Sequence, residues 1–253
     1  MCTPFELFIQ GKGMFRFAIG LAIALCSTLA LAENIAPLAV GGKEVRIAVQ
    51  DGYVQASEKT PALFATSAAA LPPALRLVEA LLAESDIKRM LIGQSMSQPY
   101  LQVQVMRDAE AVNFSEEEWR ALQPSMAQQL GATNLDPVTQ AMQESMSERM
   151  GKAAGGSVEI KFGEVGKPKV YSLAGDVIRY VIRLPIKASM NGKEVSTVLE
   201  CAGAVLVLNG KLLMFNTYRP QPDENFAKLR AFLDSAVERA QALNATPASG
   251  KGS

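Results

Sequence analysis

The sequence predicts an α+β protein in which one antiparallel sheet ends in a C-terminal meander and is flanked by helices. Alternating apolar residues dominate the chain after residue 157, which is typical of strands. Asn-Gly pairs at 191–192 and 209–210 suit type I′ hairpin turns, because both central residues take positive φ. Helical patterns precede and follow this region, and helices segregated from an antiparallel sheet define the α+β class.

The first predicted elements are short. Val45–Val49 alternates apolar and polar residues and leads through the turn Asp51-Gly52 into a short strand at Tyr53-Val54. Thr60 followed by Pro61 predicts an N-cap and first turn of a helix that runs through Ala70.

Pro72-Pro73 separates this helix from a second predicted helix over Ala74–Ala83. A helical stripe of apolar residues supports the second helix: Leu75, Val78, Leu81 and Leu82. Tyr100–Met106 alternates apolar residues with glutamines, which predicts a half-buried strand.

Ser115 and Glu118 form a capping box, so a helix is predicted to begin at Ser115. Pro124 is expected to kink it. A further helix starts at Asp136-Pro137 and runs to about Ala153, before the breaker Gly155-Gly156.

The C-terminal part is predicted to be a meander followed by a helix. Gly203 lies inside a long strand and predicts a bulge. The predicted strands are Val158–Phe162, Val170–Leu173, Val177–Ser189, Glu194–Leu208 and Lys211–Tyr218. The predicted helix, Asp223–Leu243, has one apolar face: Phe226, Leu229, Leu233, Ala236, Ala240 and Leu243.

The N-terminus has the pattern of a cleavable signal peptide. Arg16 precedes an apolar stretch over 17–25, and Ala30 and Ala32 form an A-x-A cleavage site. The stretch is shorter than the roughly 20 residues of a membrane-spanning helix. A lipoprotein reading of Cys26 is disfavoured because Leu25 stands before it, and Met14 is a plausible true start. The predicted organisation is a leader over 1–32, one α+β domain over 33–244 and a disordered tail over 245–253.

Composition excludes several functions. The leader removes only Lys12, Arg16 and Glu6 from 25 basic and 25 acidic residues, so the mature chain is nearly neutral and has no electrostatic footprint for nucleic acid or an anionic membrane. The chain has no histidine, which removes the usual general base and zinc ligand. No nucleotide-binding, nucleophile-elbow or calcium motif is present, so we predict no catalytic residues, no metal site and no cofactor.

Several residue groups admit both a functional and a structural interpretation. Val138, Met142, Met146 and Met150 form a helical stripe that could hold Cu(I) through thioethers, but adaptable core is the favoured interpretation. The run Glu116–Glu118 points around a helix and cannot converge on one cation, so capping and solvation explain it.

Single polar residues are interpreted in the same way. Cys201, the one cysteine left after cleavage, has no neighbouring cation and is expected to be buried and inert. Trp119 is expected to anchor the core rather than to line a ligand pocket with Tyr218. A catalytic pair of Lys59 with Ser57 or Tyr53 is disfavoured.

The order of elements resembles the Mog1/PsbP-like domains of small exported bacterial proteins, which are α-β-α sandwiches. The likeness rests on a strand leading into Asp51-Gly52-Tyr53-Val54, the strand Tyr100–Met106, the capped helix near Phe114, the meander and the closing helix. The double helix over 115–153 is longer than that family has. The resemblance implies an accessory or binding module without catalytic residues.

Three functional classes stay open. A non-catalytic accessory or binding module of the cell envelope, periplasmic or secreted, ranks first and predicts a groove or an exposed apolar patch. A carrier predicts a cavity of about 300 Å³ or more between the meander and the helices. An enzyme predicts two carboxylates about 5 to 10 Å apart in a cleft, one with a raised pKa. The partner is an unknown protein or a small molecule.

Overall fold

The computed structural model describes residues 34–92, 94–190, 193–219 and 226–245. The predicted signal peptide with Ala30 and Ala32, the turn Asn191-Gly192 and the tail from residue 246 lie outside the described residues.

The described strands confirm the α+β class. One sheet has the order β3-β4-β5-β10-β9-β8-β6, with β7 also pairing β8, and its neighbouring strands are antiparallel. Its strands are β3 (Tyr53–Gln55), β4 (Leu75–Ala83), β5 (Tyr100–Met106), β6 (Val158–Phe162), β7 (Lys169–Ser172), β8 (Ile178–Met190), β9 (Lys193–Leu208) and β10 (Lys211–Arg219).

The predicted C-terminal meander is confirmed. β8, β9 and β10 pair in succession, with Tyr180 opposite Gly203 and Gly203 opposite Asn216. Asn209 and Gly210 have φ of 48° and 78°, as a type I′ turn requires.

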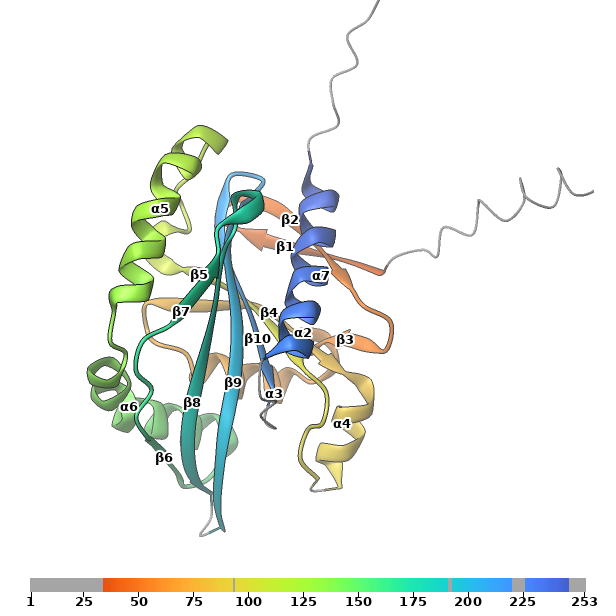
Figure 1. Cartoon of the computed structure of the whole chain (residues 1–253). Helices are drawn as coiled ribbons and strands as arrows, with labels where there is room; N and C mark the ends of the chain where they lie inside the picture. The colour runs from red at the N-terminus through yellow and green to blue at the C-terminus, as the bar shows by residue number, and fades with distance from the viewer. Residues whose placement is uncertain (1–33, 93, 191–192, 220–225, 246–253) are drawn as a thin grey trace, which may run out of the picture. The chain divides into compact units, whose positions relative to one another are not determined.

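One face of the sheet is covered by α7 (Ala227–Asn244) together with a hairpin of β1 (Asn34–Val40) and β2 (Lys43–Val49). Leu229, Leu233 and Ala240 of α7 are buried here against sheet residues such as Leu213 and Phe215. Figure 1 shows α7 on the side of the sheet opposite α5 and α6. The apolar face predicted for this helix is confirmed from Leu229 to Ala240. Phe226 is buried but precedes α7 with a φ of 59°, and Asp223 lies outside the described residues.

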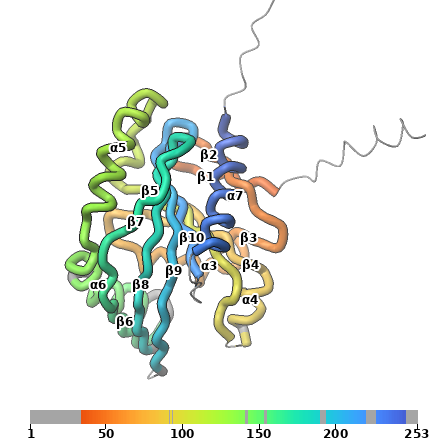
Figure 2. Tube along the Cα trace, in the orientation of Figure 1, coloured from red at the N-terminus to blue at the C-terminus, as the bar shows by residue number. Residues whose placement is uncertain are grey.

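The other face is covered by helices from the middle of the chain (Figure 2). Neighbouring residues of one strand divide between the faces: Leu213 lies on the α7 side and Leu212 packs under α5. The remaining described helices are α2 (Ala56–Lys59), α3 (Pro61–Ala69), α4 (Glu84–Leu91), α5 (Glu116–Ala132), α6 (Asp136–Ala154) and the 3₁₀ turns η2 (Arg107–Ala109) and η3 (Ala174–Asp176).

The predicted helix over Ala74–Ala83 is wrong, because Leu75–Ala83 forms β4 between β3 and β5. A shift in register between Leu77 and Glu79 interrupts the two-residue alternation. Leu77 and Ala80 therefore share one face, a three-residue spacing that resembles a helical stripe. Both faces of β4 are buried, so tertiary packing overrides the helix propensity of its residues.

The predicted bulge at Gly203 is also wrong, since the register of β9 with both neighbours runs through it unbroken. The glycine serves packing instead. A Cβ at position 203 would overlap Cζ of the Tyr180 ring, so the ring lies directly over this strand.

The interpretation of Tyr100–Met106 as half-buried needs correction as well. β5 is a strand as predicted, but Gln102 and Gln104 are 7% and 1% exposed. Both faces of β5 are therefore buried, and the two glutamines belong to the interior.

Candidate ligand-binding pocket

Local sequence chemistry fixes the start of α5 as predicted. Ser115 Oγ accepts from the Glu118 amide at 3.2 Å, and a Glu118 carboxylate oxygen accepts from the Ser115 amide at 2.8 Å. The backbone hydrogen bond from Ser115 lowers the pKa of Glu118. The capping box therefore sets where α5 begins.

Trp119 packs α5 against the sheet. Its side chain is 2% exposed, and its indole Nε1 donates to the carbonyl of Asp176 at 2.6 Å. The prediction that Trp119 anchors the core is confirmed.

The segment between β5 and α5 is held by a buried lysine. Lys211, 1% exposed, donates from Nζ to the carbonyl oxygens of Glu110, Ala111 and Val112 at 3.0, 3.4 and 3.2 Å. The Phe114 amide donates to the carbonyl of Gly210 at 2.8 Å. These bonds tie residues 110–114 to the start of β10.

The carboxylate of Glu110 joins the same segment to the rest of the fold. It accepts hydrogen bonds from Arg76 and from the Gly41 amide of the hairpin turn. The hydrogen bond from Arg76 lowers the pKa of Glu110.

A pocket of about 230 Å³ lies between α5 and the sheet. We call it the α5 pocket. It is lined by Met106, Met126, Gln129, Leu130, Thr133, Ile178, Val205, Leu212 and Met214.

The chemistry of the α5 pocket is apolar. None of the described residues that line it is charged, and three are methionines from β5, α5 and β10. Gln129 and Thr133 are polar and exposed, and Thr133 Oγ1 donates to the Gln129 carbonyl at 2.7 Å, which leaves its lone pairs able to accept. An apolar site with a few polar groups is the usual composition of a small-molecule pocket.

A shallower hollow of about 440 Å³ flanks α5 toward its N-terminus, lined by Val112, Phe114, Leu122 and neighbouring residues. Three exposed large apolar side chains lie around these two hollows: Met106, Val112 and Leu122, at 40%, 43% and 36% exposure. Apolar side chains are thus exposed around both hollows beside α5.

A buried polar network borders the pocket on the sheet. Tyr180 Oη donates to Asn216 Oδ1 at 2.6 Å, Asn216 Nδ2 donates to Gln104 Oε1 at 3.1 Å, and Gln104 Nε2 donates to Gln102 Oε1 at 2.8 Å. Gln104 lies opposite Met214 in the sheet. Because these groups satisfy one another, the network acts as structural support for the floor of the pocket.

Cys201 lies beside this network, 3% exposed, with Sγ 3.8 Å from Asn216 Oδ1. Burial raises the pKa of its thiol to about 12. The prediction that Cys201 is buried is confirmed, and the raised thiol pKa agrees with the expected lack of reactivity. Tyr218 stacks on Tyr100 with ring centroids 5.2 Å apart and does not line the α5 pocket.

Both hydroxyls of the disfavoured pair of Lys59 with Ser57 or Tyr53 donate to other groups. Ser57 Oγ and its amide donate to the buried carboxylate of Glu79. Tyr53 donates to the Pro99 carbonyl at 2.9 Å, and burial raises its pKa to about 12. Both hydroxyls are structural.

The methionine stripe of α6 is less buried than expected. Val138 is 46% exposed, and Met146 and Met150 are partly buried. The Met142 side chain lies outside the described set. The expectation that this stripe forms core is therefore wrong at Val138, because that residue lies in the first turn of α6 on an exposed surface. Glu116–Glu118 are exposed in the first turn of α5, and Glu118 completes the capping box, in line with the expected capping and solvation.

The buried carboxylates of Asp86 and Glu200 bind neighbouring groups of the fold. Asp86 accepts from the amides of Ser97 and Gln98 at 3.0 and 2.7 Å, and Glu200 pairs with Arg183 at 3.2 Å. The carboxyl groups with a resolved change, Glu110, Glu118, Asp136 and Glu148, all have a lowered pKa.

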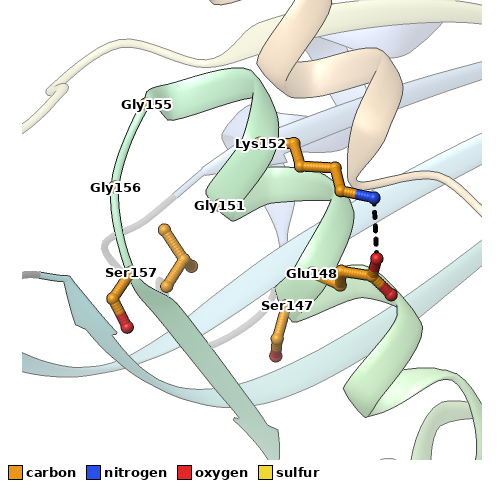
Figure 3. Close-up of a pocket in the computed structure, with 8 residues that line it drawn as sticks. Ser147, Glu148, Gly151, Lys152, Gly155, Gly156 and Ser157 are labelled. Carbon is orange, nitrogen blue, oxygen red and sulfur yellow. Dashed lines mark hydrogen bonds and ion pairs between the residues drawn. The ribbon is translucent and has the colours of Figure 1, made fainter.

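No group of three Cys, Asp or Glu side chains in the described part of the chain could hold a metal ion. A further hollow of about 520 Å³ lies where α6 ends (Figure 3). Three of its polar side chains are engaged: Ser147 Oγ donates to the Gln143 carbonyl and accepts from the Ile160 amide, and Lys152 pairs with Glu148. Helix termination explains this hollow.

Comparisons with known proteins assign no family to this chain. No family model matches the chain, and no curated protein matches it. The chain is similar to the solution structure of cyanobacterial PsbP (CyanoP) from Synechocystis sp. PCC 6803, with a TM-score of 0.34 and 11% identity over 85% of this chain and 95% of that one. This likeness is weak. Within the described residues, no helix is long and apolar enough to cross a membrane.

Proposed function

We propose that this protein is an exported, non-catalytic binding module that holds a small apolar ligand in the α5 pocket. The observation that carries the proposal is the uncharged lining of this pocket between α5 and the meander. Its volume of about 230 Å³ falls below the range of roughly 300 to 1,000 Å³ for drug-sized ligands. It exceeds the engineered cavity of about 150 Å³ that binds benzene in another protein. A ligand of one ring or a short chain fits.

Export is part of the same proposal and rests on the predicted signal peptide. Cleavage after Ala32 leaves the whole of β1, which begins at Asn34. Val40, Val45 and Ile47 of the β1–β2 hairpin are at most 1% exposed, so the mature chain keeps the hairpin that covers one face of the sheet.

Native mass spectrometry of the mature protein from an exported fraction tests the proposal. We expect a co-purifying small molecule, or, for an empty protein, shifts of [¹³C]methyl-methionine NMR signals on titration with cyclohexanol. Leu130→Trp fills the pocket and should abolish both signs of binding. Leu122→Trp is the matched control, because Leu122 lies on the same helix but lines only the outer hollow. Absence of both signs in the wild type would refute the proposal.

A further inference from the structure

We infer that the α5 pocket selects an uncharged molecule with a single aromatic ring and one hydroxyl-type polar group. This inference rests on the proposed function and names the class of ligand. It follows from the charge, the sulfur content and the polar edge of the lining.

The charge of the lining excludes ionised ligands. Every described lining residue is neutral, so a carboxylate or an ammonium placed there would lose its hydration without gaining a counter-charge. A neutral ligand complements this lining.

The sulfur content favours an aromatic ring over a saturated one. Met106, Met126 and Met214 come from three different elements and meet only in the fold. Thioether sulfur makes favourable contacts with aromatic rings, mostly at the ring edge, and a saturated ring of similar volume offers no such contact.

The polar edge of the pocket orients the ligand. Gln129 in the last turn of α5 and Thr133, the C-cap residue of α5, are the polar members of the lining. Thr133 Oγ1 already donates to the helix backbone, so toward a ligand it acts as an acceptor. A hydroxyl on the ring can donate to it while the ring stays among the methionines.

A matched pair of probes, phenol and cyclohexanol, tests the ring preference in the mature protein. Their dissociation constants are measured by [¹³C]methyl-methionine NMR for the wild type and for Met126→Leu, and by isothermal calorimetry for the triple variant Met106→Leu/Met126→Leu/Met214→Leu. Leucine conserves volume and removes sulfur. We expect the preference for phenol to fall by roughly 2- to 10-fold for each ring–sulfur contact removed, while the affinity for cyclohexanol stays unchanged.

The control substitution is Met150→Leu on α6, which does not line the pocket and should leave both affinities unchanged. Binding of both probes with a ratio that the methionine substitutions do not alter would overturn the inference and leave the proposed function standing. Failure of both probes to bind the wild type would instead count against the proposed function.

A second pair, benzyl alcohol and benzoate, tests the charge argument. We expect benzoate to bind at least 10-fold more weakly at pH 7. Equal affinity would contradict the claim that the site requires an uncharged ligand.

Discussion

At the scale of single residues, several polar side chains in the interior are structural. Gln104, Asn216 and Tyr180 satisfy one another, and Gly203 makes room for the Tyr180 ring. The ring in turn contributes to the apolar cluster under α5. The identity of residue 203 thus affects the network and the packing beneath the pocket together.

Gly203→Ala is expected to destabilise the protein by about 1–3 kcal/mol, because the added methyl group forces the ring to move in a packed core. Urea unfolding followed by circular dichroism measures the change. In a Tyr180→Leu background the same substitution should cost clearly less, since the overlapping ring is gone. An equal cost in both backgrounds would show that the ring is not the cause.

At the scale of elements, the pocket depends on how the 110–114 segment and α5 are held. The capping box sets the start of α5, and Lys211 supplies a donor for three carbonyl groups of the segment. The segment lies between Met106, which lines the pocket, and Phe114, which lines the outer hollow. Removal of the Lys211 ammonium group should therefore reduce both the stability of the protein and its affinity for a ligand.

Lys211→Met keeps the apolar stem and leaves the three carbonyls without their shared donor. We expect a loss of about 1–3 kcal/mol in the free energy of unfolding, measured by urea denaturation, together with weaker binding of cyclohexanol. The control is Lys43→Met, because Lys43 is exposed and surface substitutions change stability by about 0.5 kcal/mol or less. If Lys211→Met left the free energy of unfolding unchanged, the role assigned to Lys211 would be refuted.

At the scale of the whole molecule, the start and the end of the described chain pack together. Asn244 Nδ2 donates to the carbonyl of Arg46 at 2.7 Å, and the Arg46 amide donates to Asn244 Oδ1 at 3.0 Å. The β1–β2 hairpin and α7 contribute to one core cluster. Stability therefore comes from long-range packing, without any disulfide among the described residues.

The predicted cleavage after Ala32 would remove Cys2 and Cys26 and leave Cys201 as the one cysteine of the mature chain. We expect the exported protein to begin at Glu33 by intact mass and its melting temperature to be independent of added reductant. A melting temperature that falls in reductant would contradict this, because it would require a disulfide to a retained or external cysteine.

The sequence by itself determined the features that depend on neighbouring residues. The capping box of α5, the positive φ values at Asn209-Gly210, the strands of the meander and the start of α6 at Asp136 all follow from chemistry within a few positions. The burial of Cys201 and Trp119 followed from their apolar surroundings.

Tertiary structure alone decided the rest. The run Leu75–Ala83 has helical composition but becomes a strand because β3 and β5 pair with it and both its faces are covered. The α5 pocket joins residues from four strands and one helix, and Met106, Met126 and Met214 share no local pattern. A site assembled by non-local packing leaves no spacing in the sequence, since the contacts that create it exist only once the sheet and α5 have come together.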